Sequence, residues 1–114
     1  MDYDKGWLVG IIEGEGCFIY RFTPMVRVAM IDEDTIDKVI TLLGAKKYIS
    51  KTSTNKPYYI AHLGGKDAIA LAVGIRPLMS KRRQAQIDDM LSQIPADALV
   101  LRRYQEMVIK AIQP

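Results

Sequence analysis

The sequence predicts an α+β domain in which helices pack on one face of a four-stranded antiparallel sheet. Two pairs of short runs alternate between apolar and polar residues, a turn signal interrupts each pair, and segments with helical spacing flank both pairs. The predicted order is helix, strand, strand, helix, strand, strand, helix, with further helices toward the C-terminal end, at about 80–112. A chain of 114 residues can bury one ordinary core, so we expect a single domain over 1–114.

The first helix is expected over residues 4–14 and should end near Gly16. Asp4 can cap it, and four apolar residues follow at three- and four-residue spacings: Trp7, Leu8, Ile11 and Ile12. Gly10 and Gly14 lie four residues apart on the same helix. Because glycine lowers helix stability, this pair indicates that another backbone approaches closely there.

The first hairpin is expected from two alternating runs on either side of a Thr-Pro turn. Residues 17–23, CFIYRFT, place Phe18, Tyr20 and Phe22 on one face. Pro24 should end this strand, and residues 25–31, MVRVAMI, should form the next one. Within that second strand, Val26, Val28 and Met30 alternate with Met25, Arg27 and Ala29.

The rest of the chain predicts one more hairpin and four more helices. Acidic residues begin a helix at 32–44, and Gly44 ends it. The second hairpin pairs 46–53 with 58–63 around the turn TNKP. The remaining helices are expected at 65–79, 81–94 and 96–112.

Helices on one side of the sheet leave its other face free to bind a partner. We expect this uncovered face to carry basic and hydroxyl side chains, which can contact DNA phosphates and base edges. Its expected members are Arg21, Thr23, Arg27, Lys47, Lys51 and Ser53. For the last strand two phases remain open: either Tyr58, Ile60 and His62 point outward, or Tyr59, Ala61 and Leu63 do.

Composition predicts an intracellular protein, and its basic pairs are either solvated surface or, where several of them share one face, a binding site for a polyanion. The net charge is only +3, but basic residues cluster at 46–47, 81–83 and 102–103. The single cysteine excludes an internal disulfide, and the N-terminal residues do not have the pattern of a secretion signal. We expect no membrane association, and a location in the cytoplasm or nucleoid, an organelle, or a phage-infected host.

The segment Leu8–Gly16, LVGIIEGEG, resembles the LAGLIDADG motif of homing endonucleases, with glutamate at both acidic positions. The resemblance continues through CFIY, IDEDTIDKVITLLGA and IRPLMSKRRQAQ, and so covers about residues 4–92. It implies a motif helix over 4–16 and an αββαββα fold with a saddle-shaped sheet. The implied activity is sequence-specific, metal-dependent cleavage of double-stranded DNA. Whether the gene lies in an intron, an intein or a free-standing frame remains open.

The resemblance also implies that two motif helices pack together, so a chain with one motif should act as a C₂ homodimer. The target should then be a palindromic or pseudo-palindromic DNA site. The implied dimer interface comprises Leu8, Gly10, Ile11 and Gly14.

Glu15 matches the family's catalytic, metal-binding acid, and Lys81 matches a basic residue near the active site. The implied cofactor is Mg²⁺, for which Mn²⁺ can substitute. Glu13 is open to two interpretations, a structural carboxylate or a metal ligand. The full set expected to contact DNA is Arg21, Thr23, Arg27, Lys47, Lys51, Ser53, His62, Arg82 and Arg83.

One departure from the family concerns the end of the second strand. Many members place a glutamine or another polar residue there, whereas this chain has Met30 and Ile31. The alternative function is therefore a non-cleaving DNA-binding regulator, or an RNA-splicing helper of the maturase kind, on the same scaffold.

Overall fold

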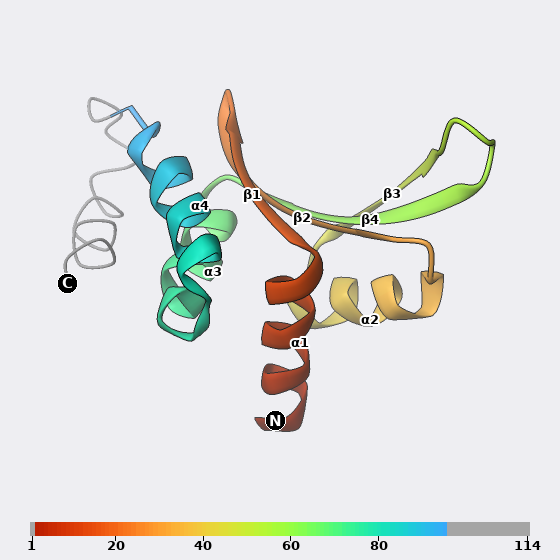
Figure 1. Ribbon diagram of the computed structural model, residues 1–114, viewed down its shortest axis with the longest axis horizontal. Coiled ribbons are helices and arrows are strands. Elements are labelled where there is room, and N and C mark those ends of the chain that lie inside the picture. The colour runs from red at the N-terminus through yellow and green to blue at the C-terminus, as the bar shows by residue number, and fades with distance from the viewer. Residues whose placement is uncertain (1, 96–114) are drawn as a thin grey trace. The chain divides into compact units, whose positions relative to one another are not determined.

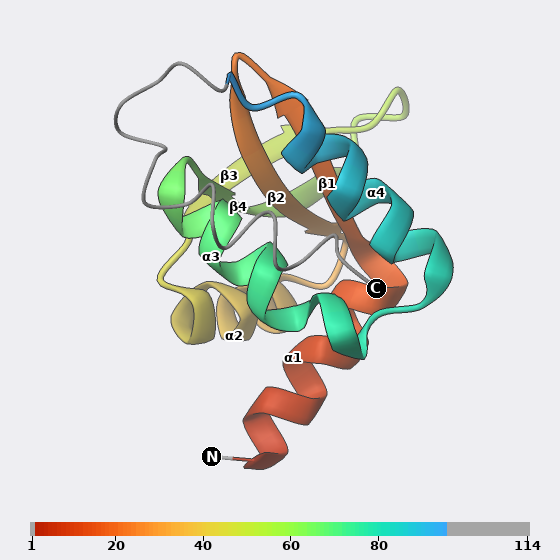
Figure 2. The same cartoon turned by 90° about the vertical axis from the view of Figure 1, so that its left-hand side faces the viewer.

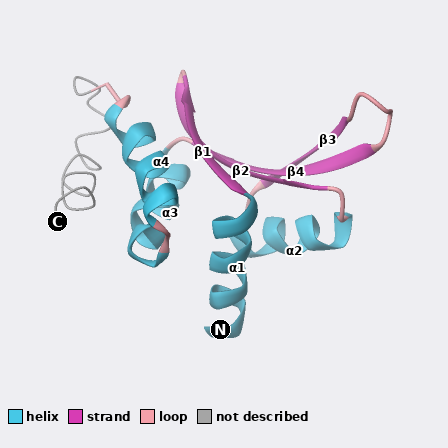
Figure 3. Cartoon of the chain, viewed as in Figure 1, coloured by secondary structure: helices cyan, strands magenta, loops and turns pink. Residues whose placement is uncertain are grey.

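The computed structural model describes residues 2–95, which fold into helices and an open antiparallel sheet (Figures 1 and 3). The strands lie in the order β1-β2-β4-β3. The predicted α+β class and the αββαββα order are confirmed, while the helix expected at 96–112 lies outside the described residues. The elements are α1 (Asp2–Glu15), β1 (Gly16–Arg21), β2 (Thr23–Met30), α2 (Glu33–Leu43), β3 (Lys46–Lys51), β4 (Pro57–Gly64), α3 (Lys66–Ile75), the short 3₁₀ helix η1 (Arg76–Leu78) and α4 (Lys81–Ser92).

No helix within residues 2–95 is long and apolar enough to cross a membrane.

The described residues form two compact units. The first unit holds residues 2–17 and 26–63, and the second holds 18–25 and 64–95. Each unit is described by itself below, and the expectation of one domain over 1–114 stays a prediction.

In the first unit, α1 and α2 lie on the same side of β2, β4 and β3, and the opposite face of these strands carries neither helix (Figures 1 and 2). The most deeply buried side chains are at most 1% exposed and come from both helices and from β2: Ile12, Val26, Val28, Ile36 and Val39. The strand β4 adds Ile60, Ala61 and Leu63, which are 2–8% exposed. The predicted alternation of β2 is confirmed, because its two core valines lie on either side of the half-buried Arg27.

The first helix begins earlier than predicted and is held against α2 by a cation. Asp4 does not cap α1 but lies within it, and its Oδ1 is 3.8 Å from Lys38 Nζ. The same ammonium lies 4.1 Å from the centre of the Trp7 ring, a cation–π contact. Together with the buried Ile12, these contacts attach α1 to α2 on one side of the helix.

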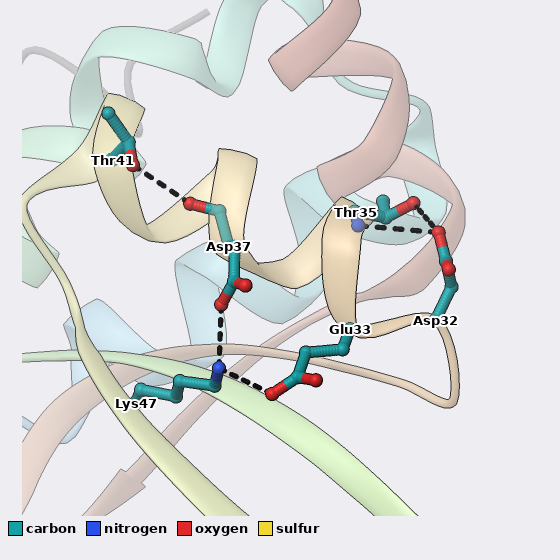
Figure 4. Close-up of polar contacts among 6 residues, drawn as sticks. All are labelled: Asp32, Glu33, Thr35, Asp37, Thr41 and Lys47. Carbon is teal, nitrogen blue, oxygen red and sulfur yellow. Dashed lines mark hydrogen bonds and ion pairs between the residues drawn. The ribbon is translucent and has the colours of Figure 1, made fainter.

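The ends of α2 follow ordinary capping chemistry. The Asp32 carboxylate accepts hydrogen bonds from the backbone N–H and the hydroxyl of Thr35 (Figure 4). Gly44 adopts the left-handed conformation, with φ 66°, and donates its N–H to the Ile40 carbonyl. The helix predicted at 32–44 is therefore confirmed, with both predicted end signals in use.

In the second unit, α3 and α4 contact each other and are joined through η1 (Figure 2). Their contact buries Ile69, Ala72, Ile87 and Met90 completely. A bidentate ion pair connects Arg76 to Asp88, with Nε–Oδ1 at 2.7 Å and Nη2–Oδ2 at 2.8 Å. The hydrogen bonds to Asp88 raise the pKa of Arg76 above its usual value.

The first hairpin turns at a different residue from the one predicted. The chain reverses at Phe22, which has φ 63° and is fully exposed, so the expectation that Phe22 shares an inner face with Phe18 is wrong. Pro24 does not end a strand but is buried as the second residue of β2. A strand tolerates proline where its missing N–H is not needed. The Pro24 carbonyl still accepts a hydrogen bond from the Gly65 N–H at 3.0 Å.

The junction between α1 and β1 requires glycine. A Cβ added at Gly16 would lie 2.5 Å from the carbonyl oxygen of Ile12 and 2.9 Å from its Cγ2. The oxygen belongs to the backbone and cannot move aside as a flexible side chain could. Only glycine therefore lets the helix pass into the strand without a spacer, with Glu15 as the last helical residue.

We expect Gly16→Ala to lower the free energy of unfolding by about 1–3 kcal/mol, the usual cost of overpacking. Gly74→Ala in α3 is the matched control, because an added Cβ there meets nothing within 4 Å. The control should leave stability unchanged or raise it by up to about 1 kcal/mol, since alanine favours helix. Urea unfolding followed by circular dichroism measures both, and equal stability of the two variants would contradict the packing argument.

Candidate acidic site and nucleic-acid interface

The C-terminal end of α1 concentrates negative charge where a helix least favours it. Glu13 and Glu15 both lie in the last turn, which contains no basic residue, and Glu15 is exposed. The helix dipole makes this end negative, so a carboxylate here costs about 0.3–1 kcal/mol unless a cation is near. A positive ion or group beside the exposed Glu15 would offset this cost.

Residues 2–95 do not by themselves supply a metal centre. Among residues 2–95, no group of three His, Cys, Asp or Glu side chains is arranged to hold an ion. Glu15 offers one hard oxygen ligand, and a Mg²⁺ ion needs several. Any metal site that uses Glu15 must therefore draw its other ligands from outside this part of the chain.

The exposed side of α1 is a stripe of glycines. An added Cβ at Gly6, Gly10 or Gly14 would meet no heavy atom within 4 Å. The predicted pair Gly10 and Gly14 therefore does face open space and leaves room for another backbone. Leu8 does not share this side, because two residues correspond to a rotation of about 200° around a helix. Ile11 is half-buried beside the stripe.

The register of the second hairpin determines the phase that the sequence left open. Lys46 pairs with His62, Tyr48 with Ile60 and Ser50 with Tyr58, and residues directly opposite in a sheet share a face. The Tyr48 and His62 rings meet edge to face, with centroids 5.6 Å apart and planes at 85°. Lys47, on the alternate face, contacts α2, so Tyr58, Ile60 and His62 point away from that helix.

Lys47 was expected on the uncovered face, and that placement is wrong. Its Nζ lies 2.7 Å from a carboxylate oxygen of Asp37 and 2.7 Å from one of Glu33, both in α2 (Figure 4). Hydrogen bonds that the Lys47 ammonium donates, to Asp37 first and to Glu33 second, raise the pKa of Lys47 above its usual value. Every second residue of a strand points the same way, so Lys51, four positions after Lys47, also belongs to the α2 side. Ser53 follows β3 in the turn and is not part of the sheet face.

Four residues form a basic cluster on the face of the sheet away from α2: Arg27, Lys46, Tyr48 and His62, here called the open-face cluster. Arg27 was predicted there and lies opposite in phase to the core residues Val26 and Val28. Lys46 and Tyr48 were missed, because the choice of Lys47 assigned the wrong phase to β3. A lysine doublet alone does not reveal which of its members faces outward.

The open-face cluster is short of hydrogen-bond acceptors. Arg27 Nε is buried and has no hydrogen-bond partner. The pKa of His62 is lowered from its ordinary 6.5, first by burial and then by the positive charges of Arg27 and Lys46. A ligand that carries negative charge would relieve this repulsion.

The start of α4 also carries positive charge against the helix dipole. Lys81 and Arg82 are exposed in a first turn that contains no acidic residue. Ser80 caps the helix by accepting a hydrogen bond from the Arg83 N–H at 3.3 Å. Gln84 Nε2 donates to the carbonyls of Arg76 and Met79, at 3.0 and 3.2 Å, and so holds this end in place. The exposed lysine and arginine, together with the helix terminus, favour an anion.

Arg83 is not the exposed residue that the sequence indicated. It is only 8% exposed, and its Nη1 donates to Gln86 Oε1 at 2.9 Å. Two other residues of this unit were expected to contact DNA. Arg21 is exposed at the end of β1, and Thr23 is half-buried at the start of β2.

These features describe an αββαββα fold with a basic open sheet face and an acidic helix end. The fold is similar to that of the archaeal intron-encoded homing endonuclease I-Vdi141I, solved in complex with DNA, with a TM-score of 0.59, 12% sequence identity, and 96% of this chain and 97% of that chain covered. A structure of the homing endonuclease I-TnaI also matches, with a TM-score of 0.42, 15% identity, and 90% and 96% of the two chains covered.

No protein-family model matches the sequence, and a search of curated proteins finds no match. The similarity to I-Vdi141I confirms the predicted homing-endonuclease-like fold.

The lowered pKa of His62 predicts a loss of stability in acid. The unfolded chain takes up the His62 proton near pH 6.5, before the folded protein does, so stability falls as the pH drops from about 6.5 toward the folded pKa. We expect the His62→Asn variant to lack this pH-dependent loss of stability. Urea unfolding at about pH 7.5 and about pH 5.5 should show a smaller loss in the variant than in wild type. Equal losses would show that burial and the charges of Arg27 and Lys46 do not lower the pKa of His62.

Proposed function

We propose that the protein is a DNA endonuclease of the homing type, which cuts both strands of a specific double-stranded site as a homodimer with a divalent metal ion. The observation that carries this proposal is the exposed Glu15 at the end of α1, within a fold shared with a DNA-bound homing endonuclease over 96% of the chain. The segment LVGIIEGEG, which resembles the family motif, ends at the junction between α1 and β1.

Double-stranded DNA is the ligand that fits the open-face cluster. Phosphate oxygens would supply negative charge beside Arg27, Lys46 and His62, and base edges would offer acceptors to the exposed Lys46. Lys81 and Arg82 would add phosphate contacts from α4. Binding would then weaken steeply with salt, because each phosphate contact releases condensed counterions.

A homodimer is supported by the glycine stripe on α1. Gly6, Gly10 and Gly14 leave room for a second helix backbone, which no described part of this chain fills. Small residues at four-residue spacing allow two helices to pack closely. The similarity covers 97% of the I-Vdi141I chain, so that chain, like this one, corresponds to a single copy of the fold. We propose that two α1 helices pack along this stripe and that the target site is palindromic or nearly so.

The proposed chemistry requires two copies of Glu15. Paired carboxylates together with DNA phosphate oxygens would form the oxygen-rich surroundings that Mg²⁺ or Mn²⁺ prefers. A bound ion would make water a better nucleophile and offset charge on the leaving oxygen. In this chain, Glu15 would hold the ion, Gly16 keeps that carboxylate at the helix end, and Lys81 would place positive charge where negative charge develops.

A second candidate function, a DNA-binding protein that does not cut or a splicing helper, is favoured by the end of β2. Met30 closes this strand and the exposed Ile31 follows it, so neither offers a polar side chain to orient a water molecule. Binding to DNA would be the same in both cases. The two functions differ in whether the bound DNA is cut.

We expect Glu15→Gln to abolish metal-dependent cleavage while DNA affinity stays within about threefold, because the change removes a charged ligand but no phosphate contact. The assay selects a site from a randomised duplex library and then measures nicking with Mg²⁺ or Mn²⁺.

Asp34→Asn, an exposed carboxylate in the first turn of α2, is the control and should cut normally. Undiminished cutting by Glu15→Gln would refute the role of Glu15. Tight, specific binding by wild type without cleavage would favour the second candidate function.

The glycine stripe predicts a dimer that a single bulky residue disrupts. A Cβ added at Gly10 meets nothing within 4 Å in one chain, so each Gly10→Leu subunit should fold normally while its close approach to a second helix is blocked. We expect the variant to run as a monomer in sedimentation velocity at concentrations where wild type is dimeric. Gly74→Leu in α3, also with open space around it, should remain dimeric. A dimeric Gly10→Leu protein would place the interface elsewhere.

A further inference from the structure

Phe22 at the tip of the β1–β2 hairpin combines two unfavourable features in one residue. It is 101% exposed, so its ring contacts nothing else in the described chain. Its φ of 63° places a bulky side chain in the left-handed region that favours glycine or asparagine. Within residues 2–95, only Asn55 shares a positive φ among non-glycine residues, and asparagine tolerates it.

Local folding does not explain the choice of phenylalanine at this turn. A glycine would relieve the backbone, and any polar residue would be better solvated. Departures from local preference without a structural gain concentrate at functional positions. The ring is therefore well placed to contact a partner molecule.

The surroundings of Phe22 favour a nucleic acid as that partner. Arg21, exposed at the end of β1, directly precedes it, and residues 18–25 contain no acidic side chain. An apolar aromatic ring beside a guanidinium suits a base step next to a phosphate. Such rings unstack base steps as wedges in duplex DNA or stack on exposed bases.

We propose that Phe22 is a DNA-contacting wedge, whose ring inserts at a base step while Arg21 binds the adjacent phosphate. This inference rests on the proposed DNA-binding function and adds a contact that uses stacking rather than charge. Insertion of the ring would deform the duplex at the hairpin tip, so the protein would prefer DNA with a flexible base step at that point.

The test compares Phe22→Ala with Arg21→Ala by fluorescence anisotropy on a fluorescein-labelled, mixed-sequence duplex over a range of salt concentrations. We expect Phe22→Ala to bind roughly 5- to 150-fold more weakly, as expected for a lost stacking contact, with an unchanged slope of log affinity against log salt. Arg21→Ala should reduce that slope by about one, because it removes one phosphate contact.

Phe22→Gly separates a binding role from a structural one. It relieves the positive φ, so its urea midpoint should equal or exceed that of wild type while its DNA affinity falls as in Phe22→Ala. A parallel loss of stability and affinity would overturn the proposal, because it would make Phe22 a structural residue.

A fluorescent probe reports the contact directly. Phe22→Trp in a Trp7→Phe background leaves one tryptophan in the chain, at the hairpin tip. Its emission should be quenched when the duplex is added, because indole stacked on bases loses fluorescence. Unchanged emission at saturating duplex would refute insertion.

The remaining outcomes separate this inference from the function on which it rests. If wild type binds the duplex and Phe22→Ala binds equally well, only the wedge is refuted. If wild type does not bind DNA at all, the proposed function fails and the wedge fails with it. If Phe22→Ala turns a dimer into a monomer, the ring belongs to a contact between two chains, and the DNA contact is overturned.

Discussion

The contact between Gly16 and the Ile12 carbonyl is the constraint on which the proposed active site depends. With 2.5 Å between a prospective Cβ and that oxygen, only glycine permits the direct passage from α1 to β1. Because no loop intervenes, the backbone of Glu15 is held between the helix and the strand. A carboxylate that must meet a second carboxylate and a phosphate needs such a rigid support.

The end of α1 and the start of α4, which are the candidate binding sites, differ from the ends of α2, which serve only the fold. At α2, the Asp32 cap and the left-handed Gly44 follow the preferences of isolated helices. At the end of α1 and the start of α4, charges of the disfavoured sign stand in the terminal turn instead. Each arrangement costs local stability and favours a counter-ion, which is the pattern expected where a bound ligand completes the electrostatics.

Lys46 and Lys47, the first two residues of β3, point to opposite faces of the sheet and have different surroundings. Lys47 spans Glu33 and Asp37, so its charge is neutralised within the protein and ties β3 to α2. Lys46, one residue earlier, lies opposite His62, where burial first and then repulsion from Arg27 and Lys46 lower the pKa of the imidazole. Two identical neighbours thus have opposite roles, because successive residues of a strand point to opposite faces.

The sequence by itself determined the fold class, the order of the elements, the α2 caps and the motif that ends at Glu15, since these depend on periodicity and on residues close together in the chain. It did not determine the Phe22 turn, the buried Arg83, or the faces of Lys46 and Lys47. Those depend on the register between β3 and β4 and on contacts between residues far apart in the chain. A shift of one residue reverses every side chain of a strand, and only tertiary packing selects among such alternatives.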